Sequence, residues 1–133
     1  MNSLRPDIIQ LRAEQREQHQ CWLLSHGARA WLRLDADRAK AEEMLISRDH
    51  GTFMIRWSAK QQKYVLPVKC GNEIGHCLIN NGAHGFGFTE PFKYSSLTEL
   101  VLHYAVNSLE GHNKGLRTTL MFPIGSDSSS LEL

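Results

Sequence analysis

Three runs of β-forming residues between residues 52 and 80 constrain the fold more than any other feature of the sequence. The runs cover Thr52 to Trp57, Lys63 to Cys70 and Ile74 to Asn80, and Gly71-Asn72 supplies a turn between the last two. Strands that follow one another so closely favour an antiparallel meander. Two phenylalanines between glycines, at residues 86 to 88, add a short further strand or loop.

One helix is predicted before these strands and one after them. Asp35 to Ile46 has the pattern of a helix opened by an aspartate cap. Ser96-Leu-Thr-Glu99 is a capping box, and apolar residues then recur at the spacing of one helix face as far as Tyr104. A polar loop from Asn107 to Gly115 and an apolar, strand-like run from Thr118 to Phe122 follow. Helices around a central antiparallel sheet make an α+β domain rather than a doubly wound one.

A helix is also predicted at the N-terminus, over residues 6–27. Pro6 suits its first turn, no breaker interrupts it, and Gly27 suits the left-handed residue that ends a helix. Residues at alternating spacings of three and four form a heptad-like stripe that is half polar. Such a helix is not expected to be stable alone, so it should pack against a partner or be the end of a longer coiled coil. The stripe consists of Ile8, Leu11, Gln15, Gln18 and Trp22.

Charge and hydropathy exclude two classes of partner. Fifteen Lys and Arg against fourteen Asp and Glu leave a net charge of +1, too weak a field for a general nucleic-acid or membrane-surface binder. No stretch approaches the ~18 consecutive apolar residues that a membrane span requires. Residues 125–133 are rich in serine and are expected to form a disordered tail.

The three cysteines, Cys21, Cys70 and Cys77, favour a cytoplasmic location, because their number is odd and the first residues lack the apolar core of a secretory signal. Six residues separate Cys70 from Cys77, which fits neither a C-x-x-C redox pair nor a familiar zinc spacing, even beside His76. We therefore predict no metal and no cofactor. An enzyme that uses Cys77 and His76 is disfavoured, because adjacent residues of a strand point to opposite faces.

Arg56 is the residue that does not fit a core. Alternation puts Met54 and Arg56 on one face of their strand and Phe53 and Ile55 on the other, so both faces look covered. A guanidinium there is costly to desolvate unless an anion meets it, and no acid lies nearby in the sequence. The side chain could reach water from the strand end, pair with a distant carboxylate, or bind an anion from another molecule.

The residues after Arg56 favour the anion. Ser58 and Lys60 follow in a predicted turn, so two charged donors and a hydroxyl converge, and backbone N–H groups can add further donors. A guanidinium offers a rigid fork that matches two phosphate oxygens. Phosphate is therefore the ligand that fits best.

Motifs spread over residues 31–124 together resemble a Src homology 2 domain. The resemblance implies a central antiparallel sheet flanked by two helices and a module that binds phosphotyrosine peptides rather than an enzyme. The motifs are Trp31, Arg38, Ala41-Glu42, Leu45, Gly51-Thr-Phe-Met-Ile-Arg56-x-Ser58, Tyr64, His76-Cys-Leu-Ile79 and Leu97-x-x-Leu100-Val101-x-x-Tyr104.

Longer runs are similar to the C-terminal Src homology 2 domain of class IA phosphoinositide 3-kinase regulatory subunits. In that family the domain follows a coiled coil that grips the catalytic subunit, and Trp22-Leu-Leu-Ser-His-Gly27-Ala-Arg29 is similar to the end of that coiled coil. The other runs are Gly85-Phe-Gly-Phe-Thr-Glu-Pro91, Tyr94-Ser-Ser-Leu-Thr-Glu-Leu-Val-Leu-His-Tyr104 and Ser108-Leu-Glu-Gly-His-Asn113.

The resemblance implies a role for each matching residue of a phosphate pocket. Arg56 would make the bidentate phosphate contact, and Arg38 would lie over the phosphotyrosine ring and also reach the phosphate. Ser58 and the turn up to Lys60 would close over the remaining oxygens. His76 would form a wall of the pocket, or would be a buried imidazole satisfied by backbone groups.

A second set of residues is expected to shape an apolar slot for the third residue after the phosphotyrosine, which in this subfamily favours methionine. Its members are Cys77, Phe88, Tyr104 and Leu109. The expected partners are tyrosine-phosphorylated proteins. If the parent protein has a longer coiled coil, a phosphoinositide 3-kinase catalytic subunit is expected as a further partner. The alternative is a coiled-coil assembly or regulatory fragment with a weakened phosphate pocket.

Three positions depart from the family pattern, and a proline interrupts one predicted strand. Ala59 stands where a second hydroxyl is usual, Trp57 replaces a usual acidic residue and Leu34 a usual glycine, so phosphate affinity is expected to be lower. Pro67 lies inside the second predicted strand, where it removes a ladder donor, and the strand is expected to be bulged or locally unpaired there.

Overall fold

The computed structural model describes residues 5–125, with the side chains of residues 14–125. A six-stranded sheet has the order β5-β4-β3-β1-β6, and β2 also pairs with β3. All pairs are antiparallel except β1 with β6. The elements are α1 (Arg5–His26), η2 (Ala28–Ala30), α2 (Arg38–Leu45), β1 (Thr52–Phe53), β2 (Arg56–Ser58), β3 (Lys63–Cys70), β4 (Glu73–Gly82), β5 (Gly85–Gly87), α3 (Leu97–Val106), η3 (Leu109–Gly111) and β6 (Phe122–Pro123).

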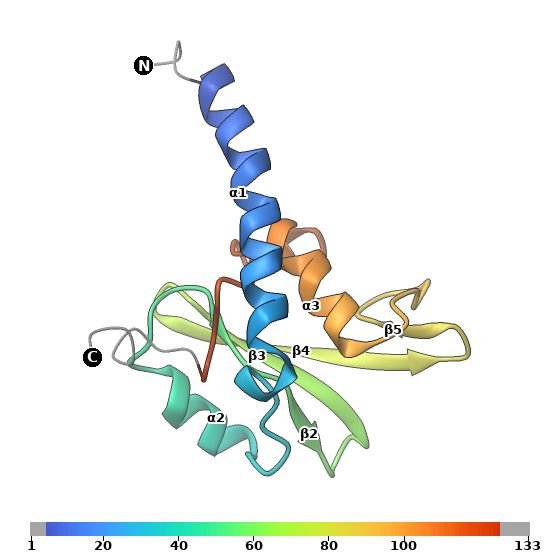
Figure 1. Cartoon of the computed structure of the whole chain (residues 1–133). Helices are drawn as coiled ribbons and strands as arrows, with labels where there is room; N and C mark the ends of the chain where they lie inside the picture. The colour runs from blue at the N-terminus through green and yellow to red at the C-terminus, as the bar shows by residue number, and fades with distance from the viewer. Residues whose placement is uncertain (1–4, 126–133) are drawn as a thin grey trace.

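The sheet is covered on both sides, as the α+β prediction requires. Helix α2 lies on one side, and α3 lies on the other with the end of α1 beside it (Figure 1). Phe53 and Ile55 belong to the larger core cluster with α3, whereas Met54 packs with Ala41 and Leu45 of α2. The alternation read from the sequence is thus confirmed, and it leaves Arg56 on the α2 side.

The predicted strand Thr52–Trp57 is divided into β1 and β2, and Pro67 supplies the reason. Phe53 pairs with Val68 and Arg56 with Val65, so the register is the same on both sides of the break and no bulge is present. The N–H of Met54 donates to the carbonyl of Pro67 at 3.2 Å, but proline has no N–H to return the bond. The expected local loss of pairing is therefore found, without a bulge.

The caps of the two helices follow simple capping chemistry, with two corrections. Helix α2 begins three residues later than predicted, because the side chain of Asp37, not Asp35, accepts from the N–H of Lys40 at 2.8 Å. Helix α3 begins as predicted, with the Ser96 hydroxyl accepting from the N–H of Glu99. The Glu99 carboxylate accepts from the N–H of Ser95 rather than from Ser96.

The C-terminal part of α1 packs against the domain that follows it. Leu23 is only 2% exposed and belongs to the larger core cluster. Gln20 Nε2 donates to the Leu102 carbonyl at 2.9 Å, and His19 Nε2 lies 2.8 Å from the Leu120 carbonyl. The helix therefore has a partner within its own chain.

The predicted stripe coincides only in part with the face that docks, because Trp22 is its one described member that packs against the larger core cluster. Gln15 and Gln18 are exposed and Trp22 is half-buried, while the side chains of Ile8 and Leu11 lie outside the described residues. Leu23, one position beyond the stripe, is the residue that enters the core. Gly27 has the left-handed φ of 73° that its place after the helix predicts.

The C-terminal segment differs from the predicted strand Thr118–Phe122, since only Phe122 and Pro123 join the sheet. The N–H of Leu120 donates instead to the carbonyl of Tyr104, so the segment is held by the end of α3. The predicted disordered tail lies outside the described residues from position 126 onward.

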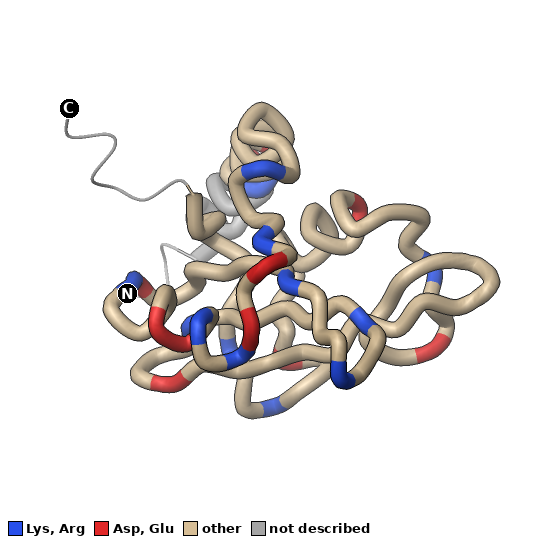
Figure 2. The backbone as a smooth tube through the Cα atoms, turned by 90° about the horizontal axis from the view of Figure 1, so that it is seen from below, with Lys and Arg blue, Asp and Glu red and all other residues tan. Residues whose placement is uncertain are grey.

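Charges of both signs are interspersed along the chain (Figure 2). Over the described residues no continuous basic stripe is seen in that view, which agrees with the net charge of +1. None of the helices described is long and apolar enough to cross a bilayer.

Candidate functional site

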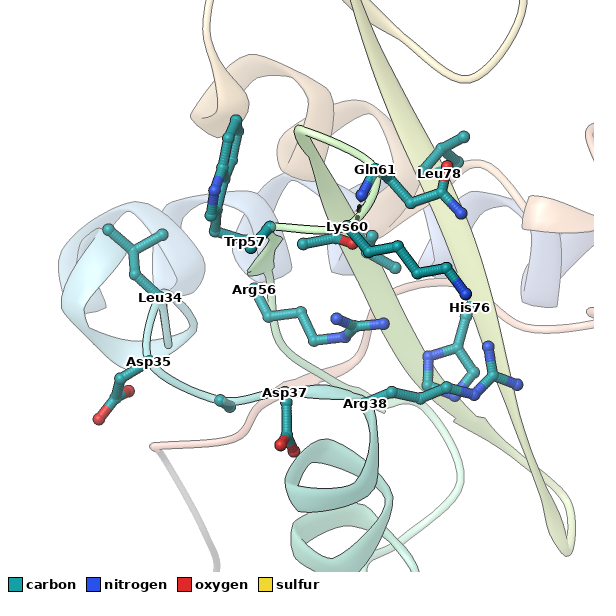
Figure 3. Close-up of a pocket in the computed structure, with 14 residues that line it drawn as sticks. Leu34, Asp35, Asp37, Arg38, Arg56, Trp57, Lys60, Gln61, His76 and Leu78 are labelled. Atoms are coloured by element: carbon teal, nitrogen blue, oxygen red, sulfur yellow. Dashed lines mark hydrogen bonds between the residues drawn. The ribbon is translucent and has the colours of Figure 1, made fainter.

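A pocket of about 600 Å³ lies on the α2 side of the sheet, between the start of α2, strand β2 and the turn that follows it (Figure 3). We call it the phosphate pocket, after the ligand that the sequence predicts for it. Its lining includes all five residues for which the sequence predicts a phosphate-pocket role, namely Arg38, Arg56, Ser58, Lys60 and His76. They come from three separate segments of the chain, namely the start of α2, β2 with its turn, and β4, so the fold brings them together.

Arg56 lies deep in this pocket and is only 6% exposed. Its Nε is buried without a hydrogen-bond partner, and none of the ion pairs found among the described residues involves it. Burial lowers the pKa of Arg56 from its ordinary value, and the charge of Arg38 lowers it further, while Asp37 and Glu42 oppose the shift. A guanidinium remains charged, so the pocket holds a largely buried cation without a close counterion among the described residues.

A carboxylate that the sequence reasoning did not assign to the pocket connects two of its walls. Glu42, one turn after Arg38 on α2, accepts from His76 Nε2 at 2.8 Å and lies 3.5 Å from Arg38 Nε. The hydrogen bond from His76 lowers the pKa of Glu42. Burial lowers the pKa of His76, although the hydrogen bond to Glu42 works in the opposite direction. His76 is therefore uncharged at neutral pH.

The two interpretations of His76 left open by its sequence are partly reconciled by this geometry. Its side chain is 8% exposed and lines the pocket, as a wall residue should. Its Nε2 is satisfied by a carboxylate and not by backbone, and its Nδ1 is buried without a partner.

The turn after β2 is closed by its own hydrogen bonds. The Ser58 hydroxyl accepts from the N–H of Gln61 at 3.1 Å, and the Ser58 carbonyl accepts from the N–H of Gln62 at 2.7 Å. The hydroxyl hydrogen of Ser58 remains free to be donated to an anion. Ala59 contributes no hydroxyl, and Lys60 extends over the pocket towards His76 (Figure 3).

Trp57 does not fill the pocket. Its indole points away from the Arg56 guanidinium (Figure 3) and meets the ring of Tyr64 at 5.0 Å. Strand alternation places it on the other face from Arg56 and Ser58, and it is 37% exposed. Leu34 is exposed beside it. Neither departure from the family pattern blocks access to Arg56.

A second pocket of about 380 Å³ lies at the end of α3, on the other side of the sheet. Two residues of the predicted slot, Phe88 and Tyr104, line it, with their rings 4.9 Å apart. The other two, Cys77 and Leu109, are 2% and 0% exposed and lie in the core rather than in the lining. They can shape this pocket only from beneath.

The second pocket is more polar than the predicted slot. Its rim carries Lys93 and Glu90, and two imidazoles, His103 and His112, contribute to its walls. Burial is the main factor that raises the pKa of Tyr104 to about 12, and neighbouring Tyr94 adds to it. In the sequence, His103 is only a residue of a predicted helix and His112 only a residue of a polar loop. Neither pattern indicates that the two side chains face the same pocket.

No three His, Cys, Asp or Glu side chains of residues 14–125 gather in a group that could hold a metal ion. Cys77 lies beside His76 on β4, but burial raises the pKa of its thiol to about 12. That thiol stays protonated near neutral pH, which does not suit a nucleophile.

Comparisons with known proteins agree with this geometry. A sequence model of the SH2 domain matches residues 31–104. Human proto-oncogene vav is 36% identical over 94 residues, which are 70% of this chain and 11% of that protein. Mouse guanine nucleotide exchange factor VAV3 is 33% identical over 101 residues, 75% of this chain and 12% of that protein. This chain thus spans about a tenth of the length of these curated relatives.

A solved structure extends the likeness to three dimensions. The solution structure of the VAV1 SH2 domain complexed with a tyrosine-phosphorylated peptide from SLP76 superposes with a TM-score of 0.67 at 35% identity. The match covers 73% of this chain and 71% of that one.

Proposed function

This chain belongs to the SH2 domain family, and we propose that it binds peptides carrying phosphotyrosine, with the phosphate on Arg56 and a later side chain in the second pocket. The observation that supports this most is the buried Arg56 guanidinium, which has no close counterion among the described residues. A phosphoryl group carries about −1.5 to −2 charge at neutral pH and would supply that counterion.

Each residue of the phosphate pocket has a role in this proposal. Arg56 makes a bidentate contact, Ser58 donates its free hydroxyl hydrogen, and Lys60 closes the pocket from above. Arg38, which is paired with Glu42 on α2, covers the phosphotyrosine ring and also reaches the phosphate. His76 is the wall between them.

The proposal predicts that phosphotyrosine is preferred over phosphoserine, because Arg56 is buried and a phosphoserine side chain is too short to reach it from a backbone at the surface. Titration calorimetry with a phosphotyrosine-x-x-Met peptide, its unphosphorylated twin and its phosphoserine version measures this. We expect binding of the first peptide only. Equal affinities for the two phosphopeptides would contradict the proposal.

Glu42 offers a second test, because its carboxylate competes with the phosphate for Arg38. Glu42→Gln keeps an acceptor for His76 Nε2 and removes the charge, so affinity for the phosphopeptide should rise about two- to fivefold. The matched control is Glu43→Gln, since Glu43 is an exposed neighbour paired with Lys40 at 3.7 Å. A fall in affinity for Glu42→Gln would mean that the charge is needed to position the pocket.

The finer part of the proposal is the subfamily. The runs around Tyr94–Tyr104 and Ser108–Asn113 support a phosphoinositide 3-kinase regulatory-subunit type with methionine as the third residue after phosphotyrosine, whereas the relatives described above are vav proteins. Its partners would then be tyrosine-phosphorylated receptors or adaptors, which it would bind in the cytoplasm. Binding of a kinase catalytic subunit through a longer coiled coil stays a prediction.

The alternative is that α1 serves in coiled-coil assembly with another helix. The exposure of Gln15 and Gln18 supports this alternative. Both lie on the heptad-like stripe, and neither belongs to the core cluster through which Leu23 holds α1 on the domain. Sedimentation at high protein concentration decides this point, since a monomer would argue against self-association of the stripe.

A further inference from the structure

Five rings line the second pocket, which we now call the aromatic pocket. Phe88 is central, with Tyr104 at 4.9 Å and His112 stacked at 4.8 Å with an interplanar angle of 23°. His103 lies 4.7 Å from Tyr104 and 5.1 Å from Tyr94. Two of the five rings are therefore imidazoles, whose charge can change near neutral pH.

His112 is held by stacking and not by hydrogen bonds of its ring. Its Nδ1 is buried without a partner, and its position is fixed by its backbone N–H, which donates to the Leu109 carbonyl at 2.9 Å. An imidazole that makes no polar contact through Nδ1 contributes an apolar face while it is neutral. It becomes an uncompensated cation when it is protonated.

We propose that His103 and His112 determine which side chain the aromatic pocket accepts at the third position after phosphotyrosine. With both imidazoles uncharged the pocket takes an apolar side chain such as methionine, and with them protonated it takes a carboxylate such as glutamate. This inference rests on the proposed function.

The chemistry of the two states differs enough to reverse a preference. A thioether makes favourable contacts with aromatic rings, and a carboxylate buried among neutral rings loses its hydration without compensation. Protonation adds one or two positive charges beside Lys93, so the same carboxylate then gains ion-pair partners. Burial lowers the pKa of both histidines, and Lys93 adds to the shift at His103, so the neutral state is the one present at neutral pH.

The other charged groups around the pocket do not supply the same switch. Lys93 and Glu90 bring one charge of each sign to the rim, and beside η3 Glu110 pairs with Arg117 at 3.3 Å. The pKa of Tyr94 and that of Tyr104 are both raised by burial, so neither phenol ionises near neutral pH. As the pH falls below the ordinary imidazole range, the ring charges of this pocket that change are those of the histidines.

The test compares two peptides on the full chain, phosphotyrosine-x-x-Met and phosphotyrosine-x-x-Glu, titrated at about pH 7.5, pH 6.5 and pH 5.5. The ratio of the two dissociation constants is the readout, because titration of the phosphate and of His76 affects both peptides alike and cancels. The preference for methionine over glutamate should fall about fivefold or more from the highest pH to the lowest.

Variants assign the effect to the two rings. His112→Phe keeps the stack on Phe88 and cannot be protonated, and combined with His103→Gln it should make the ratio independent of pH. His103→Gln alone, at a half-buried position, should reduce the change and serves if the double variant does not fold. His84→Gln is the matched control, because His84 is exposed on the turn between β4 and β5, outside the aromatic pocket, and should leave the pH response intact.

The outcomes separate this inference from the proposed function. Tight binding of both phosphopeptides with a ratio that does not change with pH overturns the role of the histidines and leaves phosphotyrosine binding in place. An unchanged pH response in the double variant also overturns it. Failure of every phosphopeptide to bind overturns the proposed function, and the inference with it.

Discussion

Replacement of Arg56 with alanine is expected to weaken phosphotyrosine-peptide binding by about 30- to 3000-fold, since loss of one partner of a buried charge pair costs ~2–5 kcal/mol. The effect is large because the guanidinium is 6% exposed and water cannot replace it easily. Arg56→Lys should recover only part of the affinity, because an ammonium lacks the planar fork. Titration calorimetry measures both variants.

The stability of the Arg56→Ala variant separates a lost contact from a damaged fold. In the free protein the buried guanidinium has no close counterion among the described residues, so its removal should leave the thermal unfolding temperature unchanged or higher. Arg29→Ala, at an exposed arginine of η2, is the control and should bind the peptide normally. Unchanged affinity in Arg56→Ala would rule out Arg56 as the phosphate ligand.

Replacement of Leu23 with alanine is expected to lower the free energy of unfolding by ~2–5 kcal/mol, the range for a fully buried leucine. Leu23 is 2% exposed and packs in the main core cluster although it belongs to α1. Chemical denaturation followed by circular dichroism measures the change. A large effect would show that α1 is part of the folded domain.

The neighbouring leucine provides a matched control for that measurement. Leu24 is 55% exposed, so Leu24→Ala changes the same helix by the same atoms but removes little buried surface. Its effect should stay within about 0.5 kcal/mol. Equal effects of the two substitutions would mean that α1 does not dock through Leu23 in solution.

Local chemistry made several elements predictable from the sequence. Lys63–Cys70 forms a strand with the predicted bounds, and Ser96 caps α3 as its capping box indicates. Gly27 ends α1 because a left-handed residue is needed there. Arg56 could be singled out because a cation between two covered faces conflicts with its surroundings, and such conflicts can be detected without coordinates.

The features that escaped prediction depend on contacts between distant residues. Glu42 and His76 are 34 positions apart, and no periodicity connects a helix residue to a strand residue. The aromatic pocket joins Phe88 to His112 across α3, so its imidazole wall appears only after folding. Asp35 and Asp37 are chemically equivalent caps, so residue type alone could not show that Asp37 begins α2.

The hydrogen bonds that join α1 to the domain have a mechanical consequence. Gln20 and His19 anchor the helix to carbonyls on two different segments, and Gly27 turns the chain at once into η2. This short junction, together with the two hydrogen bonds, restricts rotation of α1 relative to the domain. Any helical segment continuous with α1 would therefore hold the phosphate pocket in a fixed orientation relative to itself. A flexible linker would instead let the domain reorient.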